Sequence, residues 1–205
     1  IALKYDVSKQ QSKSKIKIYP DSSQVSDIQI SFIGAGSYAQ GNLLPYLPKS
    51  KRVSRVGILA NTGTTSKRVS EKFKFQFCTG DEKDVLNDKT NLIFIATRHN
   101  SHASYVLKAL KNNKHVFVEK PLCLNEEELD QIIDAKAKFN KSIMIGYNRR
   151  FSPLTKKIKK YINSGPMTMI YRINAGPIPK NSWIQDPKIG GGRILGELCH
   201  FVDYL

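Results

Sequence analysis

Carboxylates are scarce in this 205-residue chain. It carries 17 Asp and Glu against 33 Lys and Arg, which gives a formal net charge of +16. An excess of this size suits a nucleic acid, an anionic membrane surface or anionic small molecules such as nucleotides. The cations are spread along the chain, however, and neither zinc-finger spacing nor an RNP-like aromatic motif is present. We therefore expect a basic solvated surface and no specific nucleic-acid binding.

Cysteines and long apolar runs are also few. Cys78, Cys123 and Cys199 are too scattered for a disulfide framework, and no CxxC or Cys/His cluster predicts a structural metal. No apolar stretch approaches the roughly 18 to 20 residues of a membrane span, and the first residues lack the charged and apolar regions of a signal peptide. The sequence thus predicts a reducing, cytoplasmic location without membrane partners.

The chain lacks an initial Met, so we expect it to be a piece of a longer protein. Its length and its 40% hydrophobic content are sufficient for a buried core. Residues 1–26 are predicted to be a linker or extension from an upstream domain, because they are rich in Ser, Gln and Lys with little apolar periodicity. The first five residues have the composition of a strand from that upstream domain.

Strand-like and helix-like segments alternate from Asp27 to Tyr147. Alternation at this spacing predicts a mainly parallel, doubly wound α/β sheet of the Rossmann type, with ligands at the carboxyl ends of the strands. The expected strands are 28–33, 53–60, 75–78, 92–96, 115–118 and 142–146. The expected helices are 38–47, 66–73, 81–86, 101–112 and one that Asn125 and Glu128 cap, with Leu129, Ile132 and Ile133 as its apolar stripe.

The pattern changes in residues 148–205. An apolar stripe predicts an amphipathic helix, and residues 168–173 have the composition of a strand that begins a second layer. We interpret this region as the partial start of an α+β, open-sheet substrate domain. The stripe comprises Leu154, Ile158, Tyr161 and Ile162.

A glycine fingerprint follows the first strand. The sequence Gly34-Ala35-Gly36-Ser37-Tyr38-Ala39 has the form G-x-G-x-x-A. Gly34 permits a tight turn, Gly36 allows a pyrophosphate to approach the backbone, and Ala39 allows the next helix to pack closely. The same spacing also occurs in ordinary strand-to-helix turns. Within this alternating pattern it predicts that a dinucleotide contacts Gly34, Ala35, Gly36, Ser37 and Tyr38.

The second strand ends without the carboxylate that usually binds the adenosine ribose. No Asp or Glu occurs between Asp27 and Glu71. Hydroxyls, an amide and two cations stand there instead, and these groups suit a 2′-phosphate because they donate and do not repel. They favour NADP over the alternative, NAD, although an exposed basic loop would have the same composition. The residues are Asn61, Thr62, Ser66, Lys67 and Arg68.

Later strand ends carry further candidates. Thr97, Asn100 and His102 follow the strand at 92–96, where contacts to the nicotinamide and its ribose are expected. His99 and His102 lack a nearby carboxylate or cysteine, so a metal site is not predicted. Asn100 or Ser101 is the expected helix cap.

Two segments carry residue types suited to acid–base chemistry. Lys120 precedes Pro121 at a strand exit, where its extended backbone could hold it in a cleft to donate to a substrate oxygen, or could equally belong to a surface turn. A glycine-rich loop at 190–192 leads into a helix with Glu197 and His200 three residues apart on one face. His200 is either a core residue or a general acid or base paired with a carboxylate.

Five segments in order resemble the Gfo/Idh/MocA family of NAD(P)-dependent oxidoreductases, the group of glucose-fructose oxidoreductase and inositol dehydrogenase. They are Gly34–Ala39, Thr97–His102, Glu119-Lys120-Pro121, Tyr147–Pro153 and Gly190–His200. The resemblance implies a Rossmann domain at 27–147 followed by the substrate domain, with Glu119 and Lys120 at the cofactor. It also places Lys120 and His200 beside the carbon that exchanges hydride.

The chain departs from the family at the carboxylate residue that precedes the helix histidine. Many members have an Asp four residues before the histidine, whereas this chain has Gly196 there and Glu197 next to it. Either Glu197 takes over as a catalytic residue, or Lys120 and His200 act alone. The G-E-x-C-H variant and the linker resemble the C-terminal half of proteins that fuse an alcohol-dehydrogenase-like module to this one, which are associated with surface polysaccharide and nucleotide-sugar metabolism.

The resemblance implies hydride transfer between a nicotinamide and a secondary alcohol or ketone of a sugar or sugar derivative. It also implies a possible homodimer through the substrate-domain sheet. The alternative is a cofactor-binding regulator or pseudoenzyme without catalysis. A nucleic-acid binder that uses the run at 156–160 is disfavoured, because the run interleaves with an apolar helical stripe and reads as a solvated helix face.

Overall fold

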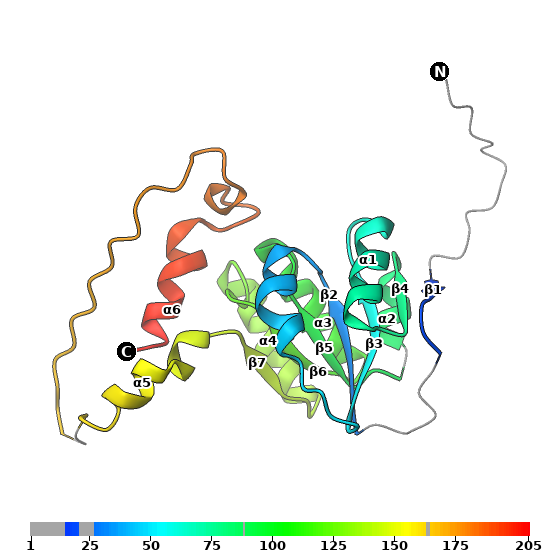
Figure 1. Cartoon of the computed structure of the whole chain (residues 1–205). Helices are drawn as coiled ribbons and strands as arrows, with labels where there is room; N and C mark the ends of the chain where they lie inside the picture. The colour runs from blue at the N-terminus through cyan, green and yellow to red at the C-terminus, as the bar shows by residue number, and fades with distance from the viewer. Residues whose placement is uncertain (1–14, 21–26, 88, 163–164) are drawn as a thin grey trace. The chain divides into compact units, whose positions relative to one another are not determined.

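A computed structural model describes residues 15–20, 27–87, 89–162 and 165–205, and its elements are labelled in Figure 1. The chain divides into two compact units, residues 1–90 and residues 91–205. Each has the mixed α/β organisation expected of a Rossmann-type fold, in which parallel strands are joined by helical crossovers. None of the helices in the described ranges is long and apolar enough to cross a membrane.

The first unit is built on three parallel strands. β2 (Ile28–Ile33) pairs with β3 (Val53–Leu59), and β3 pairs with β4 (Phe77–Thr79). Helix α1 (Gly63–Phe73) packs on β3 and β4, while α2 (Glu82–Asn87) packs on β2 and β3. Phe32 and Phe75 are fully buried in an edge-to-face contact with ring centroids 5.9 Å apart. The predicted strands and crossovers of this unit are confirmed.

A fourth strand lies where the sequence predicted only a linker. β1 (Lys15–Lys17) pairs antiparallel with β4, with Ile16 opposite Cys78. It is short and carries a lysine at each end, as is typical of a protected sheet edge. Three residues give too little periodicity for this strand to be recognised from sequence.

The helix predicted over 38–47 is present, but its interior is not α-helical. A π-helical turn, η1 (Ala39–Leu43), leads into a 3₁₀ turn, η2 (Leu44–Tyr46). Pro45 lacks the backbone N–H that an α-helical bond would need, so the winding changes at this point.

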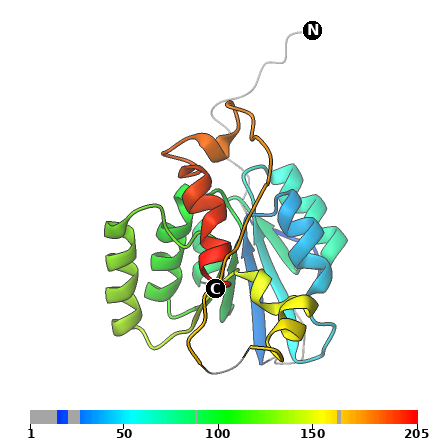
Figure 2. The ribbon, with the colours of Figure 1, turned by 90° about the vertical axis from the view of Figure 1, so that its left-hand side faces the viewer.

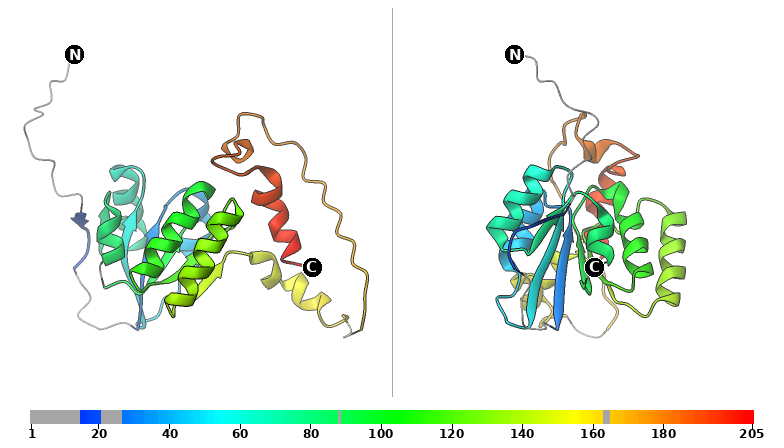
Figure 3. Two further views of the ribbon diagram at one scale, coloured as in Figure 1. Left: turned by 180° about the vertical axis from the view of Figure 1, so that it is seen from behind. Right: turned by 90° about the vertical axis from the view of Figure 1, so that its right-hand side faces the viewer.

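The second unit contains the parallel strands β5 (Leu92–Ile95), β6 (His115–Val118) and β7 (Ile143–Ile145). After β5, the 3₁₀ turn η3 (His99–Ser101) leads into α3 (His102–Lys111), which packs on β5, β6 and α4 (Glu126–Lys138). Figure 3 shows α3 and α4 side by side over these strands. The strands and helices predicted for residues 92–147 are therefore confirmed.

Asn125 caps α4 as predicted, since its Oδ1 accepts from the Glu128 N–H at 2.9 Å. The Glu128 carboxylate accepts from the Leu124 N–H at 2.8 Å, one residue before the cap itself. The predicted apolar stripe is only partly correct. Ile132 is buried, whereas Leu129 and Ile133 are exposed.

Residues 148–205 contain short elements joined by extended chain, as Figure 2 shows. They begin with η4 (Asn148–Phe151) and α5 (Pro153–Ile158), which Ser152 caps. They continue with η5 (Trp183–Gln185), η6 (Ile194–Leu198) and α6 (Cys199–Val202). Arg150 Nε donates to Asp203 Oδ2 at 2.9 Å and so ties η4 to the residue after α6.

Two predictions for this region are wrong. The helix ends at Ile158, so Tyr161 and Ile162 lie outside it. Residues 168–173 do not form a strand, although they are apolar and largely exposed. A strand needs a partner for its backbone hydrogen bonds, and no described residue pairs with this segment.

Candidate active site

The fingerprint occupies the carboxyl end of β2. Gly34 has φ of 93°, which confirms that this turn needs a residue without a side chain. Its N–H donates to Leu59 O at 2.8 Å and so fixes the turn on β3. Gly36 is exposed, and a Cβ there would meet no atom within 4 Å. Ala35 is buried, while Ser37 and Tyr38 are exposed on the same turn.

The loop after β3 presents most of the predicted polar residues to solvent. Asn61, Lys67 and Arg68 are exposed, and Thr62 is the N-cap of α1, where its Oγ1 accepts from the Thr65 N–H at 3.3 Å. Ser66 differs, because only 1% of it is exposed. Its hydroxyl accepts from the Ala60 N–H at 3.1 Å and donates to Thr62 O at 3.2 Å. Ser66 thus has almost no exposed surface for the predicted cofactor contact, and its hydroxyl holds the loop together.

His102 connects two strand-end turns of the second unit. Its Nδ1 lies 2.7 Å from Pro121 O and its Nε2 lies 3.2 Å from Thr97 O. Burial lowers its pKa, and no part of its surface is exposed. The cofactor contact predicted from the sequence therefore has no exposed surface on this residue to use. His102 instead holds the turn after β5 against the turn that carries Lys120.

The other residues predicted around this turn have separate roles. The Asn100 N–H donates to Ile189 O at 3.0 Å. Ser101 is the N-cap residue of α3, although its hydroxyl donates to Thr97 Oγ1 at 2.6 Å and makes no cap hydrogen bond. Glu119 is only 7% exposed, with its carboxylate against Gly146.

His99 was missed as a site residue, because the sequence offered it only as a weak metal ligand. It is 7% exposed, and its Nδ1 lies 2.7 Å from Gly190 O. Its ring also contacts Trp183, with centroids 4.8 Å apart. Burial is the main reason that its pKa falls to about 4. His99 therefore fastens the 183–192 loop to the turn after β5, a contact across 91 residues that no local pattern predicts.

Lys120 and His200 converge on one segment. The Lys120 ammonium donates to the carbonyl oxygen of Gly196, which lies in η6, one turn before His200. His200 Nδ1 is buried, and no described residue offers it a hydrogen bond. Burial, followed by the charges of Lys120 and Arg149, lowers the His200 pKa to about 4. The imidazole is thus neutral near pH 7, with an unused polar atom.

Tyr147 completes this cluster and was not singled out in the sequence. Its ring centroid lies 6.0 Å from that of His200, in an edge-to-face arrangement. Its pKa is raised, mainly by burial, so the phenol keeps its proton near neutral pH. The sequence analysis included it only as the first residue of the Tyr147–Pro153 segment, without a role of its own.

Glu197 does not join this cluster. Its Oε2 accepts from Arg193 Nε at 2.9 Å, and Arg193 Nη1 also donates to Gly176 O at 2.5 Å. With Phe201 and Ile173, this ion pair lines a groove of about 430 Å³. A Cβ at Gly196, the position of the family's Asp, would come within 3.1 Å of His99 Cε1. The room for a carboxylate at 196 is thus limited by His99.

Comparison with known proteins identifies the family of the chain. Residues 28–147 match the model of the GFO_IDH_MocA oxidoreductase family with its NAD-binding Rossmann fold. The chain belongs to this family. It is 30% identical over 183 residues to the uncharacterized oxidoreductase YrbE of Bacillus subtilis, a match that covers 86% of the chain and 52% of YrbE. The chain therefore spans about half the length of such a relative.

Solved structures show the same fold. Levoglucosan dehydrogenase in complex with NADH and L-sorbose aligns with a TM-score of 0.73 at 25% identity, covering 86% of this chain and 51% of that one. The 3-ketoreductase KijD10 of Actinomadura kijaniata, with NADP and TDP-benzene, aligns with a TM-score of 0.70 at 20% identity, covering 83% and 54%. The first of these structures holds NADH and the second holds NADP, and residues 28–147 of this chain have the NAD-binding Rossmann fold.

Proposed function

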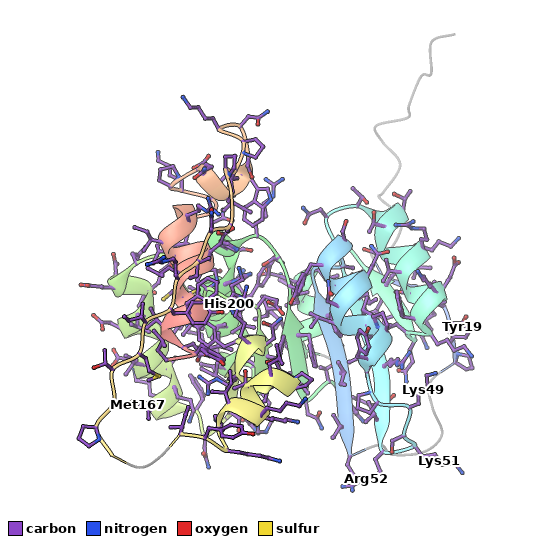
Figure 4. All side chains as sticks on the ribbon, turned by 60° about the vertical axis from the view of Figure 1, so that its left-hand side comes forward. Tyr19, Lys49, Lys51, Arg52, Met167 and His200 are labelled. Carbon is purple, nitrogen blue, oxygen red and sulfur yellow. The ribbon has the colours of Figure 1, made fainter. Side chains whose placement is uncertain are left out.

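We propose that the protein transfers a hydride between a nicotinamide dinucleotide and a secondary alcohol or ketone of a sugar or sugar derivative. One observation carries the proposal. The Lys120 ammonium donates a hydrogen bond to the Gly196 carbonyl, one turn before His200. The buried Nδ1 of His200 has no hydrogen-bond partner among the described residues. Figure 4 marks His200 on α6. A cation and an unused imidazole nitrogen at one place suit a reacting hydroxyl group.

The cofactor would be held by the turn at 34–38 and the loop at 61–68. The open space at Gly36 and the absence of a carboxylate in this loop both fit a dinucleotide with a 2′-phosphate. Asn61, Thr62, Lys67 and Arg68 are the contacts that we retain for that phosphate. The bound nicotinamide supplies or accepts the hydride. On this basis we favour NADP over NAD.

The chain's own residues would manage the substrate oxygen. In the ketone-forming direction, neutral His200 accepts the hydroxyl proton, and the Lys120 cation stabilises the developing oxyanion. The Gly196 carbonyl and the His102 contacts to Thr97 and Pro121 hold Lys120 and its turn in place. Since Glu197 is paired with Arg193, Lys120 and His200 act without a carboxylate in this proposal.

The activities named for two relatives support the substrate class. They are a myo-inositol 2-dehydrogenase of Thermotoga maritima and a levoglucosan dehydrogenase of Pseudarthrobacter phenanthrenivorans. Both names describe compounds with several hydroxyl groups. A sugar-like substrate is therefore the one to test first. Fusion to an upstream module, a cytoplasmic location and dimerisation through the substrate-domain sheet remain predictions.

The test is turnover by the complete protein that contains this chain. Lys120→Ala and His200→Ala should each lower kcat by about a hundredfold to ten-thousandfold, the usual contribution of a general acid or base. Their NADPH affinity should stay near wild type. Lys138→Ala, in α4, is the control cation, and Glu197→Gln should leave kcat unchanged. A loss in Glu197→Gln equal to that in His200→Ala would show that Glu197 replaces the family's Asp.

Cofactor choice is tested separately, by titrating NADPH and NADH. Charge-assisted contacts to a phosphate contribute about 1.5 to 3 kcal/mol each, so NADPH should bind roughly tenfold or more tightly. Removing Lys67 or Arg68 should erase most of this preference, whereas Lys111→Ala, in α3, should not. Equal affinity of the wild type for both cofactors would refute the preference.

The second candidate function is a cofactor-binding regulator or pseudoenzyme. The observation in its favour is the lack of an acid beside His200, because Gly196 stands at the family's Asp and Glu197 is paired elsewhere. Saturable NADPH binding with no turnover of any polyol by the wild type would favour it, whereas full activity in both Lys120→Ala and His200→Ala would overturn only the roles proposed for these two residues.

A further inference from the structure

A separate groove lies in the first unit, at the amino ends of the parallel strands. The fingerprint follows the carboxyl end of β2, whereas this groove is formed by the first residues of β3, the loop before them, the end of α1 and the residues after β1. Its volume is about 820 Å³, within the range of small-molecule sites. Figure 4 shows Tyr19, Lys49, Lys51 and Arg52 gathered at this end of the strands.

Among the residues that the structure describes, the charged side chains that line the groove are all cations. Its described lining includes four lysines and one arginine but neither Asp nor Glu, although the chain as a whole has about one carboxylate for every two cations. The neighbouring carboxylate of Asp27 is paired with Arg52 at 2.7 Å. The five cations are Lys49, Lys51, Arg55, Lys72 and Lys74.

Arg55 is the most informative of the five. Its guanidinium is partly buried, with Nη1 donating to Phe73 O at 2.8 Å and Nη2 donating to Leu47 O at 3.4 Å. No described residue gives it a carboxylate, and burial lowers its pKa. A partly desolvated cation without a counter-charge is costly, because carbonyl dipoles replace only part of its hydration. An anion in the groove would relieve this cost.

We propose that this groove binds a compact polyphosphate anion, with Arg55 as its fixed contact and the surrounding lysines as mobile ones. A guanidinium matches phosphate oxygens, and phosphates place several charges within a small volume. An extended acidic peptide fits less well, since alternate side chains point away from a groove and halve the charge presented. Pro45 and Pro48 offer apolar surface to any organic group attached to the phosphates.

The probe is tripolyphosphate, titrated calorimetrically into the complete protein at about 0.15 M salt, where diffuse surface attraction is screened. Saturating NADPH is present so that the fingerprint is filled, and the Gly36→Val variant is titrated without NADPH. We expect saturable binding in both cases. The double variant Lys49→Gln/Lys74→Gln should weaken it at least about fivefold, and Arg55→Met at least about tenfold.

Matched variants separate this site from general basicity. Lys156→Gln/Lys157→Gln removes the same charge from α5 and should leave affinity unchanged, and Arg55→Lys should recover part of the loss in Arg55→Met. An equal loss in the two lysine pairs, or no saturable binding at this salt, would overturn the proposal. So would a poly-glutamate peptide that binds this groove while tripolyphosphate fails to compete, because the partner would then be an acidic protein.

Discussion

Two glycine-rich turns in this chain need their glycines for different reasons. At Gly36, in the turn after β2, a side chain would meet no atom within 4 Å. At Gly190, in the loop before η6, a Cβ would overlap the Cα and the carbonyl oxygen of Ile184. The fold therefore requires glycine at 190 and leaves position 36 free.

This difference distinguishes a glycine that a ligand would require from a glycine that the fold itself requires. No described atom lies close enough to Gly36 to need the missing side chain, so we attribute this glycine to the proposed cofactor, whose pyrophosphate would lie at the carboxyl end of β2. At Gly190 the neighbours belong to the chain itself, and Gly190 O also meets His99 Nδ1 at 2.7 Å. Both turns look equally glycine-rich in sequence. Only the structure distinguishes them.

The largest effect should come from Gly36→Val. Because the position is open, the variant should unfold at the wild-type temperature, yet its β-branched side chain would stand where the pyrophosphate approaches. NADPH affinity should fall about a hundredfold or more, which corresponds to at least about 2.7 kcal/mol. Fluorescence titration and thermal unfolding measure the two quantities.

Gly80→Val is the control for this test, because Gly80 is also exposed with no atom within 4 Å of a Cβ. It should bind NADPH as the wild type does. Undiminished binding in Gly36→Val would contradict the fingerprint assignment, and a large loss of stability would show that the fold needs Gly36 after all.

A smaller effect, on stability, is expected for Gly190→Val. The new side chain must displace the backbone at Ile184, and overpacking of this kind costs about 1 to 3 kcal/mol. Trp183 is the chain's single tryptophan and contacts His99, so its fluorescence should change as the loop loosens. Urea unfolding followed at Trp183 tests both points. Wild-type stability with unchanged emission would mean that the 183–192 loop does not depend on this close approach.

The sequence predicted most of the repeating part of the fold. The strands at 28–33 and 115–118 match their predicted bounds, because apolar β-type runs between polar crossovers are a local property. Asn125 was likewise predicted correctly as a helix cap, because Glu128 stands three residues after it. Such features depend on residues that are close in sequence.

The remainder depends on distant partners. The segment at 168–173 has strand composition, but strand formation also requires a partner, which sequence alone does not provide. Ser66 and His102 are buried, unlike most of the other polar residues predicted to contact the cofactor. The loop sequences alone give no sign of this burial. The contacts of Lys120 with Gly196 and of His99 with Gly190 span 76 and 91 residues. No periodicity links positions so far apart.

The third effect concerns the pH dependence of the contact between His99 and Gly190. The pKa of His99 in the folded chain is about 4, below its ordinary value of 6.5. The unfolded chain therefore binds one more proton than the folded chain between these values. This contribution to stability is complete above pH 6.5 and is lost as the pH falls toward 4, by about 1.4 kcal/mol per pH unit within the window.

Substituting His99→Gln tests this contribution. Because His200 and His102 also have lowered pKa values, the wild type should lose stability in acid through several histidines. The unfolding free energy of the variant should fall less steeply with decreasing pH, and the difference in slope should equal the contribution of one histidine. Urea unfolding at intervals from pH 4.5 to 7.5 gives the two curves, and their difference cancels groups that titrate alike in both proteins. Parallel curves would mean that His99 is not held neutral against Gly190.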